Sequence, residues 1–567
     1  MLQLRETMAN LLLAPLVLLA GASLMMALAA VPALINRQPS WNTASGRQYG
    51  WTAIATVALL LMLIRNTVVS VPHQAVAWSP SVTLIPPLTL QSNPAGRLLG
   101  LGFAAVVLAV FVVLRGEQRQ ENGKSANPTQ PTGLAAWEKD GALLIAILAI
   151  SLVALLPANL LCLTLSWALL DGITAAAWLY AVRPRNNDQW RRVLLSWGGG
   201  AAATLLLWGA TLPLQAEFAP QRLPLPALPG WSGTALTLAI LLRLAPFPFH
   251  ILGGRSHLLG ESPGREGRSG LLIALQTAPA VAGIWLLGQL PPGEALPALW
   301  HELISALLLT GLVGCGLLAW LSKKEHQTVG WILTAQAGVV VLAGLSAGPE
   351  AALAEGMALI LAGGILTLYT RQENLAVENR IAGGLAVAAL AGLPLTWGGQ
   401  GRLALYQSWL ADGSGLSIFL AAGAHLLTMA AAARIVLRPA GPPVDRESRI
   451  RVGVALGLPA LGLLMPSGSL AVQADLPVWL AVLIPLGGGV FLAWSAPSLL
   501  PIQERTPPWL PRLLALDWLA SLIGQAGGLI GRAIQAVHQV LEAEGVLLWV
   551  LIGLALGWML LTTQPPG

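Results

Sequence analysis

A few charged side chains inside long apolar segments are the residues of this chain best suited to chemistry. The stretch LRLAPFPFH, residues 242–250, places Arg243 seven residues before His250. Ionisable groups in apolar segments are costly to bury, so they indicate a function such as proton or ion transfer. Pro246 and Pro248 interrupt helical hydrogen bonding and predict a broken helix, whose freed carbonyl groups can line a polar cavity. If the helix continued, Arg243 and His250 would share a face.

A second stretch of this kind reads GLPLTWGGQGR, residues 392–402, with Pro394 at the expected helix break and Arg402 at its end. Three further ionisable residues lie within apolar segments: Asp171, Glu355 and His425. The sequence contains no phosphate loop, dinucleotide fingerprint, nucleophile elbow or metal-ligand spacing. Intramembrane charge is therefore the chemistry that remains to be explained.

Both stretches resemble signatures of the antiporter-like subunits of respiratory complex I and of Mrp cation/proton antiporters. Residues 243–250 are similar to the family's Lys-x-x-x-x-Pro-Phe-His, with Arg243 in the place of the central lysine. Residues 392–402 are similar to its Gly-x-Pro-x-Thr-x-Gly-x-x-Gly-Lys, with Arg402 where lysine is usual. Residues 159–171 resemble its fifth helix, and residues 334–338 resemble the Ser-x-Gln-x-Gly of its tenth. The resemblance covers roughly residues 80–470.

The departures from this pattern bear on mechanism. The family's fifth-helix glutamate falls on Ala168, and Asp171 lies one turn further along; the charged residue of the eighth helix is missing, with Gln276 the nearest polar residue. Glu355 aligns loosely with a charged position of the eleventh span. A buried lysine can lose its proton, whereas arginine stays protonated in proteins. The two arginines are therefore expected to act as fixed charges that tune Asp171, His250, Glu355 or His425, or as counter-ions in a subunit that has lost pumping.

Arg243 should have an acidic partner, because burying it alone would cost several kcal/mol. The resemblance implies which one, since the family pairs its fifth-helix acid with its seventh-helix lysine. We therefore expect a direct or water-bridged contact between Asp171 and the Arg243 guanidinium.

The composition indicates an integral membrane protein. Of 567 residues, 55% are hydrophobic and 10% charged, and the mean hydropathy is +0.70; soluble chains carry about 25% charged residues. This argues against a soluble, disordered or nucleic-acid-binding protein. Because a span needs about 20 apolar residues, we expect an all-α polytopic membrane protein of about 14–16 transmembrane helices. The sixteen candidates are 10–35, 51–70, 96–114, 141–157, 159–182, 193–212, 231–251, 270–288, 300–321, 328–346, 350–370, 381–411, 415–437, 452–470, 476–497 and 545–562.

The distribution of positive charge predicts the topology. Connections after odd-numbered spans hold 25 of the 31 Lys and Arg residues. By the positive-inside rule these connections are cytoplasmic and both termini lie outside, which we assign to the plasma (inner) membrane of a prokaryote. The net charge of +6 then follows from topology and requires no acidic ligand.

Two broken segments at comparable places predict two inverted five-helix repeats. The expected regions are spans 1–3 in 1–115, the first repeat (spans 4–8) in 141–288, the second repeat (spans 9–13) in 300–437, spans 14–15 in 452–497 and the last span in 545–562. The Pro-rich segment 72–95 is expected to form an outer-face loop or hairpin. In 511–543 polar residues recur every three, four or seven positions, which predicts an amphipathic helix lying laterally along the membrane surface. That helix and the extra spans resemble the family's longest subunit.

The resemblance implies a non-redox membrane-arm subunit of an NADH–quinone oxidoreductase-type complex, contributing to proton translocation or structurally supporting it. The chain itself would hold no cofactor and no metal. Its partners would be other membrane subunits and the bilayer, with quinone-reducing or soluble redox subunits at a distance. The expected mid-membrane polar axis consists of Asp171, Arg243, His250, Glu355, Arg402 and His425. A cation/proton antiporter subunit, the membrane subunit of an inorganic-carbon uptake complex and a purely structural scaffold remain open alternatives.

Overall fold

The protein is described here by a computed structural model, in which the chain divides into two compact units, Met1–Leu514 and Ala515–Gly567. The structure describes residues 15–21, 54–56, 75–78, 88–91, 93–124, 132–182, 187–215, 223, 225, 230–253, 269–291, 296–371, 379–438, 446–464, 475–505, 513–516, 518–519, 521–526, 528–529 and 532. Most of the predicted lateral helix, most of spans 1 and 2, and the whole last span lie outside these residues. In the second unit, the described residues 518–519, 521–526, 528–529 and 532 are helical.

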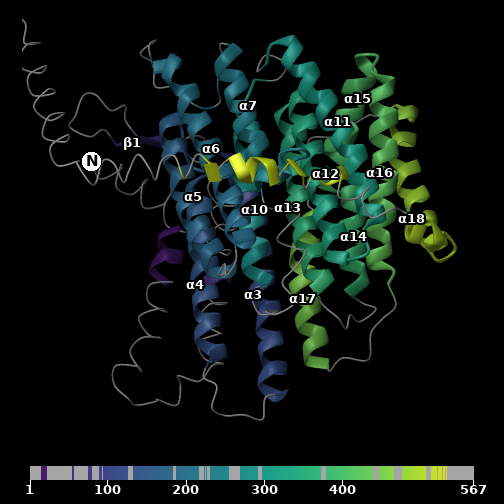
Figure 1. Ribbon diagram of the computed structural model, residues 1–567, viewed down its shortest axis with the longest axis horizontal. Coiled ribbons are helices and arrows are strands. Elements are labelled where there is room, and N and C mark those ends of the chain that lie inside the picture. The colour runs from purple at the N-terminus through teal and green to yellow at the C-terminus, as the bar shows by residue number, and fades with distance from the viewer. Residues whose placement is uncertain are drawn as a thin grey trace, which may run out of the picture. The chain divides into compact units, whose positions relative to one another are not determined.

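The predicted spans between residues 96 and 497 all correspond to described helices, and two of them are broken in the middle (Figure 1). The helices are α3 (Pro94–Lys124), α4 (Thr132–Val153), α5 (Leu160–Val182), α6 (Asn187–Gln215), α7 (Gly230–Leu244), α8 (His250–Gly253), α10 (Ser269–Leu287), α11 (Ala298–Leu321), α12 (Glu325–Ser346), α13 (Pro349–Arg371), α14 (Arg380–Ala391), α15 (Trp397–Ala411), α16 (Gly415–Val436), α17 (Arg446–Leu463) and α18 (Leu476–Arg505).

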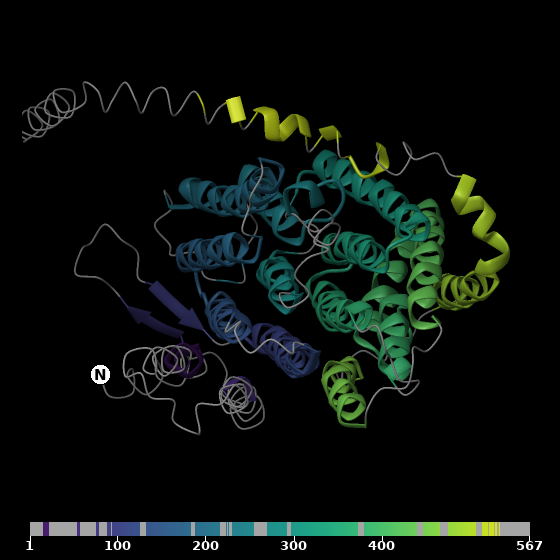
Figure 2. The same cartoon turned by 60° about the horizontal axis from the view of Figure 1, so that its bottom comes forward.

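Within the described residues, nine helices are long and apolar enough to cross a membrane. Shorter apolar helices occur at Asp140–Val153, Trp231–Leu244 and Arg380–Ala391. The expectation of an all-α polytopic membrane protein is confirmed. Figure 2 looks more nearly along the helix axes and shows α12 and α13 enclosed by other helices. Both are 94% buried over their spans, whereas α6 and α18 are 28% buried, so α12 and α13 form the centre of the first unit. Their side chains are apolar all round, as buried helices require.

A small β-hairpin joins the connections that follow even-numbered predicted spans. Strands β1 (Ala75–Trp78) and β2 (Leu88–Gln91) pair antiparallel, in agreement with the hairpin expected in 72–95. The Gln91 N–H donates to the Leu156 carbonyl at 2.7 Å, which ties β2 to the α4–α5 connection. The Leu225 N–H donates to the Gln289 carbonyl at 3.0 Å, linking the connection before α7 to the segment after α10.

Arginines join the connections that follow odd-numbered predicted spans. Arg434 donates to the Ser322 carbonyl at 2.8 Å, Arg438 to the Tyr369 carbonyl at 3.1 Å, and Arg380 to the Arg438 carbonyl at 2.8 Å. These carbonyls lie at the C-terminal ends of α11, α13 and α16, where cations stabilise the helix dipole. Each set of contacts joins connections of one parity only, so the alternation of helix ends agrees with the predicted order of spans.

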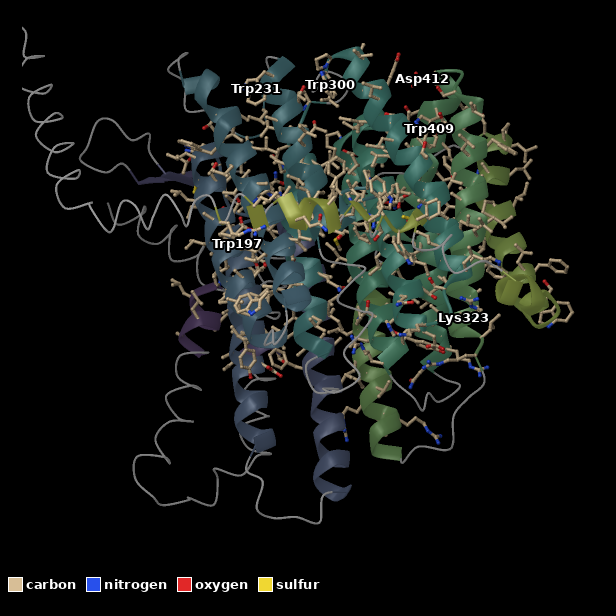
Figure 3. The ribbon with its side chains drawn as sticks, in the orientation of Figure 1. Trp197, Trp231, Trp300, Lys323, Trp409 and Asp412 are labelled. Carbon is tan, nitrogen blue, oxygen red and sulfur yellow. The ribbon has the colours of Figure 1, made fainter. Side chains whose placement is uncertain are left out.

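We predict that the arginine-rich end faces the cytoplasm. Figure 3 shows Trp231, Trp300, Trp409 and Asp412 toward one end of the helices and Lys323 toward the other. Lys323 and Asp412 are both exposed. With Cys162 and Cys315 replaced, Lys323→Cys should react with a membrane-impermeant maleimide only from the cytoplasmic side, and Asp412→Cys only from outside. Labelling of both from one face would contradict the topology.

Candidate functional site

The seventh predicted span is broken at the expected prolines. Helix α7 ends at Leu244, Ala245 adopts a left-handed conformation with φ +50°, and α8 begins at His250. Positive φ is uncommon for residues other than glycine. Because the helix does not continue, the shared helix face proposed for Arg243 and His250 does not exist, and that part of the sequence-based argument is wrong. Arg243 lies in the last turn before the break.

The twelfth predicted span breaks in a way that explains its glycines. Gly392 ends α14 with φ +84°, a conformation that glycine adopts without steric cost. Thr396 is the N-cap of α15, and its hydroxyl accepts the Gly399 N–H at 3.2 Å. A Cβ at Gly398 would lie 1.8 Å from the Ala389 carbonyl oxygen, so the chain can cross here only without a side chain. The break brings Arg402 into the second turn of α15.

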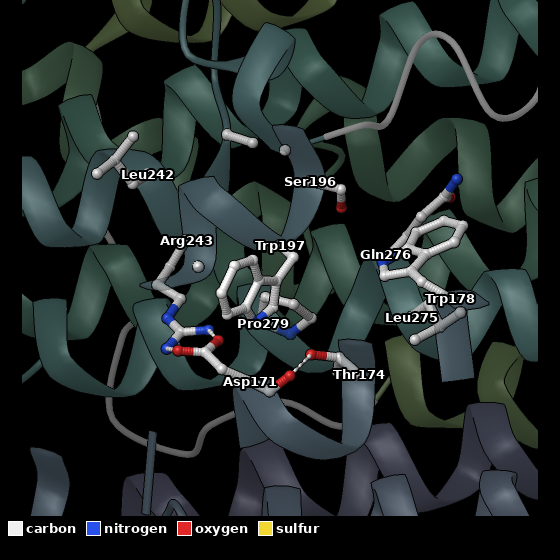
Figure 4. Close-up of a pocket in the computed structure, with 13 residues that line it drawn as sticks. Asp171, Thr174, Trp178, Ser196, Trp197, Leu242, Arg243, Leu275, Gln276 and Pro279 are labelled. Atoms are coloured by element: carbon white, nitrogen blue, oxygen red, sulfur yellow. Dashed lines mark hydrogen bonds and ion pairs between the residues drawn. The ribbon is translucent and has the colours of Figure 1, made fainter. Parts of the chain in front are cut away.

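The first cluster consists of Asp171 on α5, Thr204 on α6 and Arg243 on α7. Arg243 Nη1 donates to Asp171 Oδ1 at 2.5 Å, and Nη2 donates to Oδ2 at 2.9 Å. This two-point pairing is the strongest geometry for arginine and carboxylate, and both side chains are buried. The Thr204 hydroxyl accepts from Arg243 Nη2 at 2.8 Å and donates to Asp171 Oδ2 at 2.6 Å. The expected contact between Asp171 and Arg243 is therefore confirmed, and it is direct (Figure 4).

The acid meets Arg243 from position 171 because of the orientation of α5. Trp167, one turn before Asp171, lies on the same buried face, and the Arg243 Cζ is 4.4 Å from its ring centroid, a cation–π distance. Ala168, where the family's glutamate aligned, is exposed. An acid at that position would point away from the cluster.

A cavity of about 30 Å³ adjoins the first cluster. Its polar lining includes Asp171, Thr174, Ser196, Arg243 and Gln276, with Trp178 and Trp197 beside them (Figure 4). A buried water needs roughly 10–15 Å³ and polar partners, so the cavity has room for water. Among the described residues, the Nε of Arg243 has no hydrogen-bond partner, which a water in this cavity would supply.

The second cluster consists of Gln336 on α12, Glu355 on α13, Arg402 on α15 and His425 on α16, all at most 5% exposed. Arg402 Nε donates to Glu355 Oε1 at 2.8 Å, and Nη2 donates to Oε2 at 3.2 Å. Gln336 accepts from Arg402 Nη2 at 3.2 Å and donates to Glu355 Oε2 at 2.5 Å. Arg402 Nη1 contacts His425 Nε2. His425 Nδ1 lies 3.1 Å from the Ala421 carbonyl oxygen, so the proton belongs on Nδ1, and Nε2 accepts from the arginine.

His250 lies between aromatic rings. Its ring stacks on Phe247 and meets Trp331 edge to face, with 5.2 Å between centroids in both pairs. His250 is fully buried, at the contact of α8 with α12. The six residues of the predicted polar axis thus lie in two hydrogen-bonded clusters, apart from this histidine. That they form one proton path stays a prediction.

Three contributors to the clusters were missed in the sequence. Thr204 gave no signal, because a threonine in an apolar helix most often bonds its own helix backbone. Gln336 stood within the tenth-helix resemblance but was not assigned to the site. Gly200 on α6 allows the close approach, since a Cβ there would lie 2.6 Å from Asp171 Oδ1.

Comparisons with known proteins agree with this architecture. No protein-family model matches the chain, and no curated protein matches it. Among solved structures, the Mrp complex from Dietzia sp. DQ12-45-1b aligns with a TM-score of 0.63 and 16% identity over 98% of this chain. This chain spans 63% of that one. The membrane-bound sulfane sulfur reductase, an archaeal respiratory membrane complex, aligns with a TM-score of 0.59 and 13% identity over 96% of this chain and 99% of that one. The chain therefore has the fold of a divergent antiporter-like membrane subunit.

Adding one methyl group beside the first cluster should disturb it. We predict that Gly200→Ala lowers the free energy of unfolding by about 1–3 kcal/mol, because the new Cβ displaces Asp171 from Arg243. Gly209 lies on the same helix with no atom within 4 Å of its virtual Cβ, so Gly209→Ala is the matched control and should change stability little. Thermal unfolding of the purified proteins in detergent measures both. Equal effects of the two substitutions would show that the cluster tolerates the crowding.

Proposed function

We propose that this chain is a membrane subunit of a multisubunit ion-translocating complex. In this proposal the two clusters lie on a mid-membrane polar path for protons. The observation that carries the proposal is that each half of the body contains one complete, buried arginine–carboxylate pair beside a broken helix. Buried ion pairs often contribute little net stability compared with apolar residues of similar volume. Their presence in two places therefore favours a role in function.

The chemistry of the pairs assigns different tasks to their members. The arginines stay protonated and provide fixed positive charge. Carboxylates and imidazoles can gain or lose a proton, so Asp171, Glu355 and His425 are the exchangeable groups. A proton that arrives at Glu355 would weaken its bond to Arg402, and the guanidinium would then rely on its contacts to Gln336 and His425. Proton arrival would thus be coupled to a change in hydrogen bonding at the break between α14 and α15.

The two clusters are not equivalent in this scheme. His425 contacts Arg402 directly, so the second cluster holds a neutral acceptor beside its ion pair. In the first cluster, the described contacts of Arg243 are Asp171, Thr204 and the Trp167 ring. Water in the adjoining cavity is therefore the route by which a proton would reach Asp171. We propose that the second cluster exchanges protons more readily than the first.

The structural neighbours support membership in a larger assembly, since both are named as complexes. We propose other membrane subunits as partners, in a prokaryotic plasma membrane with the arginine-rich end in the cytoplasm. The finer proposal is an energy-converting complex of the NADH–quinone oxidoreductase type, with electron transfer in other subunits. A cation/proton antiporter subunit is the second candidate, and the TM-score of 0.63 to the Mrp complex favours it.

Proton uptake by membrane vesicles containing the intact complex tests the proposal. Glu355→Gln removes the carboxylate and keeps its shape, so we expect at least a tenfold loss of proton translocation per assembled complex. Glu302→Gln, on the exposed side of α11, is the control and should leave the rate unchanged. Undiminished translocation by Glu355→Gln would contradict the proposal.

Two additions sharpen this experiment. Arg402→Lys keeps the positive charge and loses the two-point fork, so it should assemble and retain part of the activity even if Glu355→Gln assembles poorly. Repeating the assay with and without sodium separates the two candidates. Proton movement that requires a sodium gradient identifies the antiporter, and movement driven by electron transfer in sodium-free medium identifies the redox-linked complex.

A further inference from the structure

We infer that Thr204 and Gln336 are positioning residues with the same task, each holding the arginine of its half against the carboxylate, and that acid and bridging residue stand on exchanged helices in the two halves. This inference rests on the proposed function and specifies how its two sites are built. A bridging residue here means an uncharged side chain that bonds both members of an ion pair.

The two bridging residues make the same pair of hydrogen bonds. Thr204 donates to Asp171 Oδ2 at 2.6 Å and accepts from Arg243 Nη2 at 2.8 Å. Gln336 donates to Glu355 Oε2 at 2.5 Å and accepts from Arg402 Nη2 at 3.2 Å. In both cases the bonded carboxylate oxygen is itself a partner of that Nη2. Each cluster therefore contains a closed ring of guanidinium, carboxylate and bridging group.

The order of helices shows the exchange. Counting from α4, the second helix of the first half is α5, which carries the acid Asp171, and the third is α6, which carries Thr204. Counting from α11, the second helix of the other half is α12, which carries Gln336, and the third is α13, which carries the acid Glu355. The arginine stands on the broken fourth span in both halves. Asp171 and Gln336 even share a position, since each is the twelfth residue of its helix.

The ring restricts the arginine for a physical reason. A guanidinium has a rigid fork of donors, and a carboxylate alone can be approached from several directions. A third group that accepts from the guanidinium and donates to the same carboxylate oxygen leaves one arrangement in which all partners are satisfied. Without it, a buried donor and a buried lone pair lose their partners together. Thr204 and Gln336 carry no charge, so they act through the carboxylate and the guanidinium.

An isosteric exchange in the second cluster tests the inference. Gln336→Glu combined with Glu355→Gln moves the carboxylate from α13 to α12, the arrangement of the first half, and keeps every side chain at its original size. We expect each single substitution to reduce proton translocation by the intact complex at least tenfold. The double variant should recover to within about threefold of the wild type. A double variant no more active than the weaker single variant would overturn the inference.

Threonine variants in the first cluster give a second test that does not depend on the exchange. Thr204→Ser keeps the hydroxyl and should translocate protons within about twofold of the wild type, whereas Thr204→Val should lose about tenfold. Thr237→Val is the control, because Thr237 is also buried but bonds only its own helix, donating to the Gly233 carbonyl at 2.9 Å. Full activity of Thr204→Val, or equal losses in Thr204→Val and Thr237→Val, would overturn the positioning role.

The results distinguish failure of this inference from failure of the proposed function. If Glu355→Gln alone leaves translocation intact, the proposed function fails. If Glu355→Gln abolishes translocation but neither the exchange nor Thr204→Ser preserves it, the proposed function stands and the inference fails. Thermal unfolding of the same variants in detergent provides a readout without transport, and there too the double variant should be restored toward the wild-type midpoint.

Discussion

The structure depends on one electrostatic constraint: a guanidinium in the middle of a membrane protein must meet its counter-ion on the spot. Lipid and apolar side chains do not solvate it, and arginine does not neutralise itself by releasing a proton. Arg243 and Arg402 are almost fully buried, and each forms a two-point pair with a carboxylate from another helix. The position of each arginine therefore decides which neighbouring helices must supply an acid.

Several local features follow from that constraint. Each arginine lies next to a helix break, where the backbone leaves the regular helix. Glycines remove the side chains that would separate the partners: a Cβ at Gly401 would lie 2.5 Å from Glu355 Cγ, and one at Gly200 would lie 2.6 Å from Asp171 Oδ1. The hydroxyl of Thr204 and the amide of Gln336 occupy the remaining hydrogen-bonding positions. Charge, backbone break and close helix packing thus belong to one arrangement that occurs twice.

Much of this could be predicted from the sequence, because hydrophobicity and proline are local signals. The spans between 96 and 497, both breaks and the contact of Asp171 with Arg243 follow from such signals and from the resemblance. The partners on other helices could not be predicted in the same way. Nothing near Thr204 indicates that its hydroxyl leaves its own helix, and the pairing of Glu355 with Arg402 depends on how α13 meets α15. The expected shared face of Arg243 and His250 was wrong because it assumed a continuous helix, which the prolines between them prevent.

The central claim is that these ion pairs are retained for proton movement and not for stability. Replacing one pair by apolar residues tests it most directly: the double variant Asp171→Leu with Arg243→Met, compared with Asp171→Asn, in thermal unfolding and in proton translocation by the complex. Asp171→Asn leaves a buried charge without its partner, so it should be destabilised by about 3–5 kcal/mol, whereas the apolar pair should be at least as stable as the wild type. The account predicts a stable double variant that no longer translocates protons. A double variant as unstable as Asp171→Asn, or one that is stable and fully active, would contradict it.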